Sequence, residues 1–236
     1  MVDDWERSAA AWIASQGEAG DFTRQHVLDP VMISQVAGRG YRRALDIGCG
    51  EGRFCRMIAP HIASVVGIDP SPSLVAEARR RDPSGDYRLG RAEQLDCADA
   101  AFDLVISYLS FIDIEHIDRA IAEIARVLAR GGTLLVANLN GFNTAAADGG
   151  WQTNWRGGKR HFAIDDYLVA RPNRVAWLGI DVINWHRPMS TYMSLLIDSG
   201  LRLTFFAEPA PTGGDPARAD AYRRAPYAHV MTWQRD

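Results

Sequence analysis

The sequence has little of what would place the chain in a membrane, in a disulfide scaffold or on nucleic acid. No run approaches the roughly 18 apolar residues of a membrane-spanning helix, and residues 1–7 are charged, without a signal-peptide stretch. The three cysteines, Cys49, Cys55 and Cys97, are an odd number with no paired spacing, which predicts a reducing cytoplasm. With 26 Lys and Arg against 29 Asp and Glu, the net charge of −3 offers no general attraction to nucleic acid or to an anionic membrane.

Metal ligands are also lacking, because no His, Cys and carboxylate cluster has zinc spacing. We therefore expect no metal. What the 236 residues do contain is 47% hydrophobic side chains, enough for the core of one large α/β domain.

Short apolar runs and helical patterns alternate along the first two thirds of the chain. This order predicts a parallel sheet with helices on both faces and a ligand at the carboxyl ends of the strands. Residues 5–37 look mainly helical and precede the first strand. The expected elements are strands at 43–47, 64–69, 86–89, 102–107, 132–138, 201–207 and 227–233, and helices at 52–60, 72–82 and 116–129.

The most informative segment runs from Ala44 to Phe54, ALDIGCGEGRF. A buried strand there ends in a Gly-rich turn, and glycine is needed where the backbone turns tightly or approaches a ligand. A second apolar run ends at Asp69, 21 residues after Gly48, close to the roughly 20-residue offset of a ribose-binding carboxylate. The third glycine, Gly52, comes one residue too early for the dinucleotide fingerprint, which argues against nicotinamide and flavin dinucleotides.

The D-x-G-x-G-x-G form of this loop resembles motif I of the class I S-adenosylmethionine-dependent methyltransferases, in their small-molecule, methyltransferase-11-like form. The resemblance continues, in order and spacing, through GIDPS at 67–71, RAEQL at 91–95, FDLVIS at 102–107 and RVLARGGTL at 126–134. It implies a Rossmann-like, seven-stranded, mostly parallel sheet whose last strand is antiparallel. It also implies S-adenosylmethionine as cofactor and S-adenosylhomocysteine as product.

The resemblance and the spacing divide a single domain, 1–236, into four parts. We expect an N-terminal helical lid at 1–40, a cofactor-binding core at 41–140 and the final two strands at 199–236. Residues 141–198 do not fit a short crossover between the fifth and sixth strands. We interpret them as a helical and loop insertion that caps the substrate.

Cofactor contacts are expected along the motif blocks. Asp46 anchors the loop of Gly48, Cys49 and Gly50, and Asp69 is the ribose ligand with Pro70 beside the adenine. Relatives place Asp where this chain has Arg91, and a guanidinium cannot accept a hydrogen bond from adenine. The adenine contact then falls to Ala92 or Glu93. The remaining candidates are Ser107 and Tyr108 near the methyl group, and Arg24 of the lid for the methionine carboxylate.

Acceptor contacts are expected from the lid and the insertion. His186 is the candidate general base, since imidazole titrates near neutral pH, and His161 is the alternative. Arg187 is a candidate for holding a substrate anion. The other candidate substrate residues are Trp12, Tyr192, Trp151 and Trp185, although an amphipathic helix or the core of the insertion would bury the same side chains.

These features predict transfer of a methyl group to an O or N nucleophile of a small metabolite. The sequence lacks the Asp/Asn-Pro-Pro-Tyr/Phe signature of enzymes that methylate amino groups in nucleic acids, and Cys97 has no proline partner for a base-attacking thiol. A protein or nucleic-acid methyltransferase of the same fold and a non-catalytic S-adenosylmethionine-binding protein remain alternatives, because a fold does not fix a function.

Overall fold

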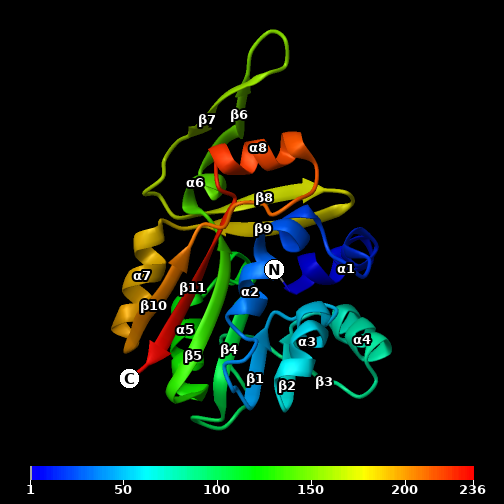
Figure 1. Cartoon of the computed structure of the whole chain (residues 1–236), viewed down its shortest axis with the longest axis vertical. Coiled ribbons are helices and arrows are strands. Elements are labelled where there is room, and N and C mark those ends of the chain that lie inside the picture. Colours follow the sequence, from blue (N-terminus) through cyan, green and yellow to red (C-terminus); the bar gives the residue numbers. More distant parts are fainter. Residues whose placement is uncertain (1) are drawn as a thin grey trace.

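Seven strands form one mixed sheet in the order β10-β11-β5-β4-β1-β2-β3 (Figure 1). The computed structural model describes residues 2–236, with only the backbone for residues 2, 3 and 147–149. Strand β11 runs antiparallel to both of its neighbours, β5 and β10, as expected. The bounds are β1 Arg43–Ile47, β2 Ser64–Asp69, β3 Asp86–Leu89, β4 Phe102–Tyr108, β5 Leu128–Leu139, β10 Leu201–Ala207 and β11 Ala228–Arg235.

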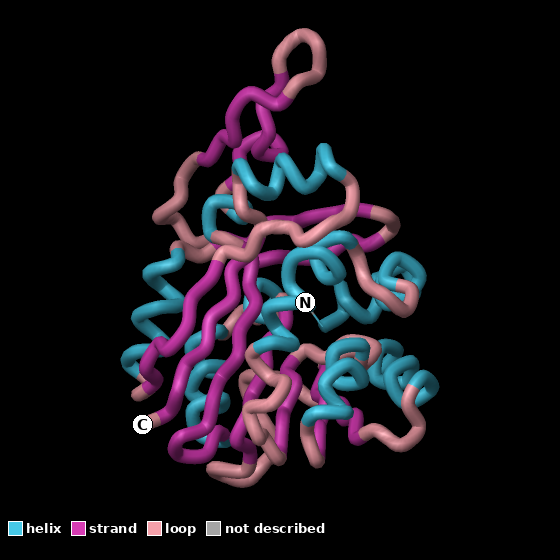
Figure 2. The backbone as a smooth tube through the Cα atoms, viewed as in Figure 1, coloured by secondary structure: helices cyan, strands magenta, loops and turns pink. Residues whose placement is uncertain are grey.

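Helices cover both faces of this sheet (Figure 2). One face packs against α5 and α7, and the other against the η1–α2 segment, α3 and, at the β3 edge, α4. The bounds are α1 Val2–Gln16, η1 Arg24–Leu28, α2 Asp29–Ser34, α3 Arg53–Ile58, η2 Ala59–His61, α4 Pro72–Arg81, η3 Phe111–Asp113, α5 Ile117–Val127, α6 Gly141–Thr144, α7 Met189–Asp198 and α8 Pro216–Arg224.

The central strands are apolar on both faces because both faces are covered. In β4, Leu104 and Ile106 point toward the α2–α3 side, whereas Val105 points toward α5 and α7. On α5, Ile121 and Ile124 lie on one helical face and are fully buried. Burying a side chain of this size stabilises the fold by about 1.5–3 kcal/mol.

Helix α1 is held against the start of α4 by a carboxylate. Glu6 accepts hydrogen bonds from Ser71 Oγ at 2.5 Å and from the Ser73 backbone N–H at 3.1 Å, and these bonds lower the pKa of Glu6. Ser71 is also the N-cap of α4, with Pro72 in the first turn, as the sequence predicts. The N-terminal segment is thereby fixed over the carboxyl ends of the strands.

The insertion is built differently from the prediction. Residues 141–198 contain the two-stranded hairpins β6–β7 and β8–β9 and the helices α6 and α7, so the expectation of helices and loops alone is wrong. The β8–β9 hairpin turns at Leu178 and Gly179, with φ of 47° and 82°. Two consecutive positive φ values are typical of the tight turns whose twist matches a hairpin. The bounds are β6 Ala146–Thr153, β7 Lys159–Ile164, β8 Arg171–Trp177 and β9 Ile180–His186.

Candidate active site

A large cavity, with a volume of about 1530 Å³, opens at the carboxyl ends of β1, β2 and β4. Its walls come from the lid helix α1, the Gly-rich loop after β1, the turn after β4, and the two hairpins and α8 above the sheet. Ligand pockets typically measure about 300–1,000 Å³, so this cavity has room for more than one ligand.

The Gly-rich loop is shaped by the backbone. Gly48 has φ of +71°, and a Cβ there would lie 2.5 Å from Ser110 Cβ. Ser110 Oγ in turn donates to the carbonyl of Ile47 at 2.7 Å. Glycine at 48 is therefore needed so that the turn after β4 can lie on the loop.

The other two glycines of the loop have different surroundings. Gly50 has φ of +56°, and a Cβ there would meet only Trp12 Nε1, at 3.6 Å. Gly52 has φ of +76° and makes room for the ring of Tyr87, which a Cβ would approach within 2.5 Å. Gly50 thus faces the cavity, whereas Gly52 serves the packing of the core.

Two buried carboxylates lie at the ends of β1 and β2. Asp46 is 1% exposed, and burial raises its pKa to about 7. Asp69 is also buried, which raises its pKa to about 6, although it accepts hydrogen bonds from the backbone N–H groups of Ser71 and Gly50, each at 2.9 Å. Burial without a cation disfavours the charged form of both groups.

Acceptor atoms without donors also lie at this end of the cavity. Asp46 Oδ1, Glu51 Oε1 and Gln16 Oε1 are buried and have no hydrogen-bond partner among residues 2–236. Glu51 Oε1 lies 3.9 Å from its two nearest guanidinium nitrogens. Leaving a buried acceptor unpaired costs about 1–3 kcal/mol. These atoms fit a ligand that brings positive charge and N–H donors.

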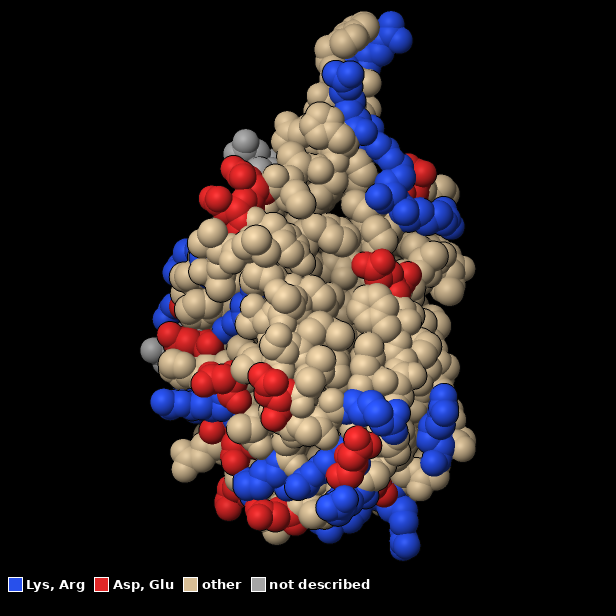
Figure 3. Space-filling view, turned by 90° about the vertical axis from the view of Figure 1, so that its left-hand side faces the viewer, with Lys and Arg blue, Asp and Glu red and all other residues tan. Residues whose placement is uncertain are grey.

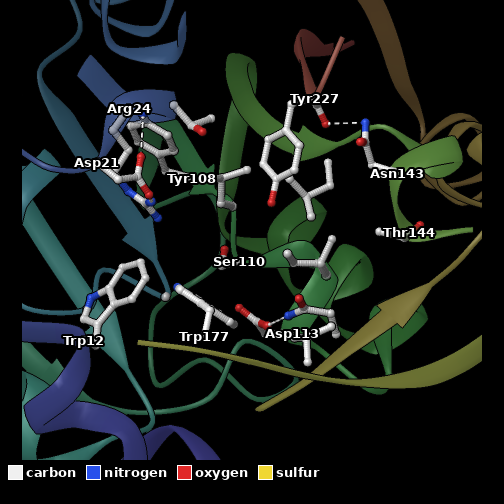
Figure 4. Close-up of a pocket in the computed structure, with 18 of the residues that line it drawn as sticks. Trp12, Asp21, Arg24, Tyr108, Ser110, Asp113, Asn143, Thr144, Trp177 and Tyr227 are labelled. Atoms are coloured by element: carbon white, nitrogen blue, oxygen red, sulfur yellow. Dashed lines mark hydrogen bonds and ion pairs between the residues drawn. The ribbon is translucent and has the colours of Figure 1, made fainter. Parts of the chain in front are cut away.

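The lid places a cation over aromatic rings at the same end (Figure 4). Arg24 forms an ion pair with Asp21 at 2.8 Å, and its guanidinium lies 4.7 Å from the Trp12 ring centroid and 5.7 Å from that of Tyr108. The Trp12 indole donates to Glu51 at 3.3 Å. Arg24, Trp12 and Tyr108 all line the cavity.

A buried ion pair ties the lid to the core below this cation. Arg53 pairs with Asp29 through its two terminal guanidinium nitrogens, Nη1 and Nη2, and Tyr108 donates its hydroxyl proton to Asp29 Oδ1 at 2.7 Å. Arg53 and Asp29 are each less than a tenth exposed. Removing one partner of such a pair strands the other charge, so this contact fixes the position of the lid.

Most of the cofactor candidates meet in this cavity. Its lining includes Pro70, Ala92 and Glu93, with Arg91 bound to Glu93 at 3.4 Å. Ser107 is different, because it is fully buried and its hydroxyl is bonded to Ser110 Oγ at 2.7 Å. The candidates among the lining residues are Arg24, Asp46, Gly48, Cys49, Gly50, Asp69, Pro70, Ala92, Glu93 and Tyr108.

The two histidine candidates do not line the cavity. His186 is fully buried; its Nδ1 lies 2.7 Å from Thr144 Oγ1 and its Nε2 lies 2.8 Å from the carbonyl of Tyr167. Burial lowers the pKa of His186. His161 lies exposed on β7. Both nitrogens of His186 are engaged inside the cap and His161 lies outside the cavity, so neither histidine faces the space where an acceptor would lie.

The acceptor candidates divide in the same way. Trp12 and Trp151 line the cavity, whereas Arg187, Tyr192 and Trp185 do not. Arg187 donates to the carbonyls of Ile114 and Glu115, both at 2.7 Å, and stacks on Trp185. Tyr192 is buried against Phe111 in the core. These three side chains hold the cap on the sheet.

Sequence reasoning missed several residues that line the cavity. Asp113 lies in the turn after β4 and accepts a hydrogen bond from Asn184 Nδ2 at 2.6 Å. A carboxylate just beyond the carboxyl end of a parallel strand was a usable signal. The other missed lining residues are Trp5, Gln16, Glu51, Arg53, Trp177 and Asn184.

Two features are absent from the described part of the chain. Within residues 2–236, no group of three or more His, Cys, Asp or Glu side chains is arranged to hold a metal ion. None of the helices described there is long and apolar enough to cross a membrane.

Comparison with known proteins shows what this chain is similar to. Residues 45–136 match the methyltransferase domain family. A ubiquinone biosynthesis O-methyltransferase of Agrobacterium fabrum is 30% identical over 158 residues, 59% of this chain and 62% of that protein. A malonyl-[acyl-carrier protein] O-methyltransferase of Serratia marcescens is 34% identical over 155 residues, 64% of this chain and 61% of that protein. The chain thus spans less than two thirds of the length of these curated relatives.

Solved structures agree with this similarity. The crystal structure of an S-adenosylmethionine-dependent methyltransferase from Mesorhizobium loti has a TM-score of 0.77 at 28% identity and covers 87% of this chain and 96% of its own. A putative S-adenosylmethionine-dependent methyltransferase from Listeria monocytogenes shares the fold, with a TM-score of 0.73 at 24% identity over 97% of this chain and 99% of its own. In sequence and in fold, the chain is similar to S-adenosylmethionine-dependent methyltransferases.

Proposed function

We propose that this protein transfers the methyl group of S-adenosylmethionine to an oxygen or nitrogen atom of a small metabolite. The observation that carries the proposal is the single cavity that joins the Gly-rich loop and Asp69 to the cap. Its volume accommodates a cofactor and an acceptor together. The curated relatives are named as O-methyltransferases, which favours oxygen as the acceptor atom. Because all three cysteines are free thiols, we also propose a reducing cytoplasm as its compartment.

The cofactor belongs at the sheet end of the cavity. Asp69 would take the ribose hydroxyls, with Pro70, Ala92 and Glu93 around the adenine. The unpaired oxygens of Asp46 and Glu51 favour the ammonium and sulfonium charges. Arg24 would hold the methionine carboxylate.

The acceptor belongs at the cap end, where the walls are aromatic and amphipathic. Trp177 and Asn184 come from the β8–β9 hairpin, and Trp151 comes from β6. Trp151 lies between two cations, with Lys159 Nζ 5.0 Å and the Arg224 guanidinium 4.8 Å from its ring centroid. Such a surface suits a flat acceptor that carries a negative charge.

The reaction is an in-line displacement, for which the sulfonium of the bound cofactor supplies the activated methyl group. The chain itself aligns the two reactants and excludes water, and alignment alone is worth roughly 7–11 kcal/mol in well-oriented reactions. Ser110 and Gly48 fix the distance between the loop and the turn after β4. The lid and the cap close the sides of the cavity.

Cofactor binding is the first test. We expect calorimetry to show S-adenosylmethionine binding, and Asp69→Ala to weaken it by about 1–3 kcal/mol, the cost of losing a charged hydrogen-bond partner. Asp86→Ala is the matched control, because Asp86 lies on the neighbouring strand and pairs with the exposed Arg88. Unchanged affinity in a folded Asp69 variant would remove Asp69 from the site.

Product formation is the second test, since the same fold occurs in the [4+2]-cyclase SpnF, with a TM-score of 0.64 at 18% identity. Mass spectrometry should detect S-adenosylhomocysteine and a methylated acceptor in equal amounts. A protein that binds the cofactor but forms no product with a broad set of small acceptors would be a binding protein instead.

A basic surface at the mouth of the cavity supports a second candidate, in which the acceptor arrives on an acidic carrier protein. Figure 3 shows Lys and Arg side chains running along the upper hairpin and α8. The likeness to malonyl-[acyl-carrier protein] O-methyltransferases is consistent with such an acceptor. The exposed basic residues are Arg156, Lys159, Arg160, Arg218, Arg223 and Arg224.

Charge reversal distinguishes free acceptors from carrier-bound ones. Arg156→Glu, Arg160→Glu and Arg223→Glu together should raise the KM for a carrier-bound thioester by about tenfold or more and leave that for the free thioester unchanged. A control triple of Arg39→Glu, Arg42→Glu and Arg130→Glu changes exposed residues near the other end of the sheet. Equal effects of the two triples would exclude docking at the mouth.

A further inference from the structure

Asp113 occupies the point where the lid, the core and the cap meet. It ends the short η3 turn after β4, and its carboxylate accepts hydrogen bonds from the Trp5 side chain of α1 and from Asn184 of β9, the latter at 2.6 Å. Figure 4 shows Asp113 beside Trp177 and below Ser110, at the wall of the cavity. No step of the mechanism described so far uses this side chain.

The turn that carries Asp113 lies directly on the cofactor loop. Ser110 fills the space left by the missing Cβ of Gly48, and Leu109 adopts a positive φ of 59° to start this turn. Asp113 follows three residues after Ser110 and lines the same cavity as Gly48 and Asp69. It therefore lies between the part of the cavity that suits the cofactor and the part that the cap encloses.

The pKa of the Asp113 carboxyl group is raised above its ordinary value. Burial raises its pKa to about 8, while the hydrogen bonds from Asn184 and Trp5 lower the pKa and the charge of Asp69 raises it further. Arg24 is the cation that acts on it, and favours the carboxylate. A base with a pKa near the working pH combines the correct protonation state with a useful driving force.

The other charged side chains on the packed elements have partners elsewhere, except Glu115, which lines the same cavity. Each of them lies on α1, on β9 or in the turn itself. Asp4 is paired with Arg7, Glu6 with the start of α4, and Asp181 with Arg174, while His186 is bonded inside the cap and Glu115 is exposed. The titration of Asp113 is thus set by Asp69, Arg24 and the ligands that enter the cavity.

We propose that Asp113 is the catalytic base, held in place by Asn184 as a positioning residue, and that the acceptor group is a hydroxyl or an amine. The inference rests on the proposed function. A lone pair of the acceptor atom forms the bond to the methyl carbon, and the carbon–sulfur bond breaks with its electron pair staying on sulfur. The acceptor proton passes to a carboxylate oxygen of Asp113, and the sulfonium becomes a neutral thioether.

The charge balance of the cavity favours this role. A cation bound beside Asp113 favours its carboxylate form, because an opposite charge at short range lowers the pKa of an acid. Cofactor binding therefore prepares the base before the acceptor is deprotonated. An acceptor that arrives as an ionised carboxylate would bring no proton to remove, and it would place a second negative charge against Asp113.

The first test needs no acceptor. Calorimetry of S-adenosylmethionine binding at pH 7.5, in buffers of different ionisation enthalpy, counts the protons released on binding. We expect the wild-type protein to release more protons than Asp113→Asn, whose amide does not titrate. Because proton release on binding means that the cofactor binds the carboxylate more tightly than the neutral acid, the affinity of Asp113→Asn should be lower than that of the wild-type protein, by about threefold. Equal proton release by both folded proteins would overturn the proposal.

The second test measures turnover with catechol, aniline and benzoate as acceptors. We expect product from catechol or aniline, and a fall in kcat of about 10²–10⁴-fold in Asp113→Asn. The wild-type kcat/KM should rise with pH as Asp113 loses its proton, and this limb should be absent in Asp113→Asn. Asp113→Glu restores a carboxylate and should recover part of the activity.

Asn184→Ala separates positioning from packing. Its hydrogen bond lowers the pKa of Asp113, so its loss should move the midpoint of the pH profile upward; a purely structural role would lower stability and leave the midpoint in place. Methylation of benzoate with equal rates in wild type and Asp113→Asn would overturn the proposal. Absence of product from all three acceptors would count against the proposed function, while the proton count still decides the state of Asp113.

Discussion

The two ends of the cavity are built from different materials. At the sheet end, the walls are backbone turns and buried carboxylates of the seven-stranded core, such as Gly48, Asp46 and Asp69. At the cap end, the walls are aromatic and basic side chains on two-stranded hairpins, such as the half-buried Trp151, while Trp155 at the tip of the same hairpin lies outside the cavity and is 86% exposed. A ligand that is common to a family can be bound by the backbone geometry of the core. An acceptor that varies between family members is bound by side chains, which substitution can change without altering the core.

The largest expected effect separates two glycines of the loop. Gly48→Ala should destabilise the fold by about 2–5 kcal/mol, because it combines overpacking against Ser110 with a left-handed backbone. Gly50→Ala should lower the free energy of unfolding by only about 1–2 kcal/mol, because it strains the left-handed backbone without overpacking. Urea unfolding measures both.

Ligand binding completes this comparison. Gly50 faces the cavity, so its substitution should weaken S-adenosylmethionine binding in a folded protein. Equal stabilities of the two variants would show that Ser110 adapts to a side chain at position 48.

The second effect lies in the cap. His186→Ala should lower the free energy of unfolding by about 2–4 kcal/mol, since it leaves a cavity and removes two hydrogen bonds, to the half-buried Thr144 and Tyr167. His161→Ala, on an exposed strand of the same cap, should change it by less than about 0.5 kcal/mol. A loss of kcat in a fully folded His186 variant, with unchanged thermal stability, would restore the base role to His186.

The third effect concerns pH at the sheet end. The pKa of Asp46 is raised to about 7 in the fold, so its contribution to stability is fully present below the pKa of the unfolded chain and is lost as pH rises through 7. Without ligand, the melting temperature of wild type should therefore fall more between pH 5 and 7.5 than that of Asp46→Asn. The difference should be about 2 kcal/mol, or about 4–8 °C. Parallel melting curves would mean that Asp46 is ionised throughout this range.

The smallest expected effect concerns the cap end of the cavity. Trp151→Ala should raise the KM for the acceptor about 2–5-fold, the worth of a partly exposed ring between cations, and leave cofactor affinity unchanged. Trp155→Ala, on the exposed tip of the same hairpin, is the control and should change neither. A loss of cofactor affinity in the Trp151 variant would mean that the two ends are not independent.

The elements of the core could be predicted from the sequence because each is encoded by residues close together in the chain. Strand β2 and the start of α4 follow from an apolar run, a Ser cap and a proline, and Gly48 and Asp69 follow from their spacing. The cap was not readable in this way. The β8–β9 hairpin turns at Leu178 and Gly179, without the Asn-Gly or Asp-Gly pair that signals such a turn.

The site was predictable only in part, for the same reason. His186 and Arg187 are adjacent in the sequence, which suggests a base beside a cation. Their hydrogen-bond partners lie in other segments of the chain and hold both side chains away from the cavity. The position of Asp113 just after β4 is visible in the sequence, but its contacts are not, because Asn184 lies 71 residues further along the chain and Trp5 lies near the N-terminus. Contacts of this kind depend on tertiary structure and leave no periodic pattern.

The insertion leaves the core after Leu139 and returns to it at Met189, where α7 begins. The proposed acceptor-binding residues of β6 to β9 therefore lie between these two attachment points, while the cofactor loop ends well before the first of them. The insertion can therefore be lengthened, shortened or replaced without changing the residues at the sheet end of the cavity. Chimaeras that exchange the insertion at these two junctions should methylate a new acceptor and still bind the same cofactor. The incoming segment must supply a hydrogen-bond donor for Asp113 in place of Asn184.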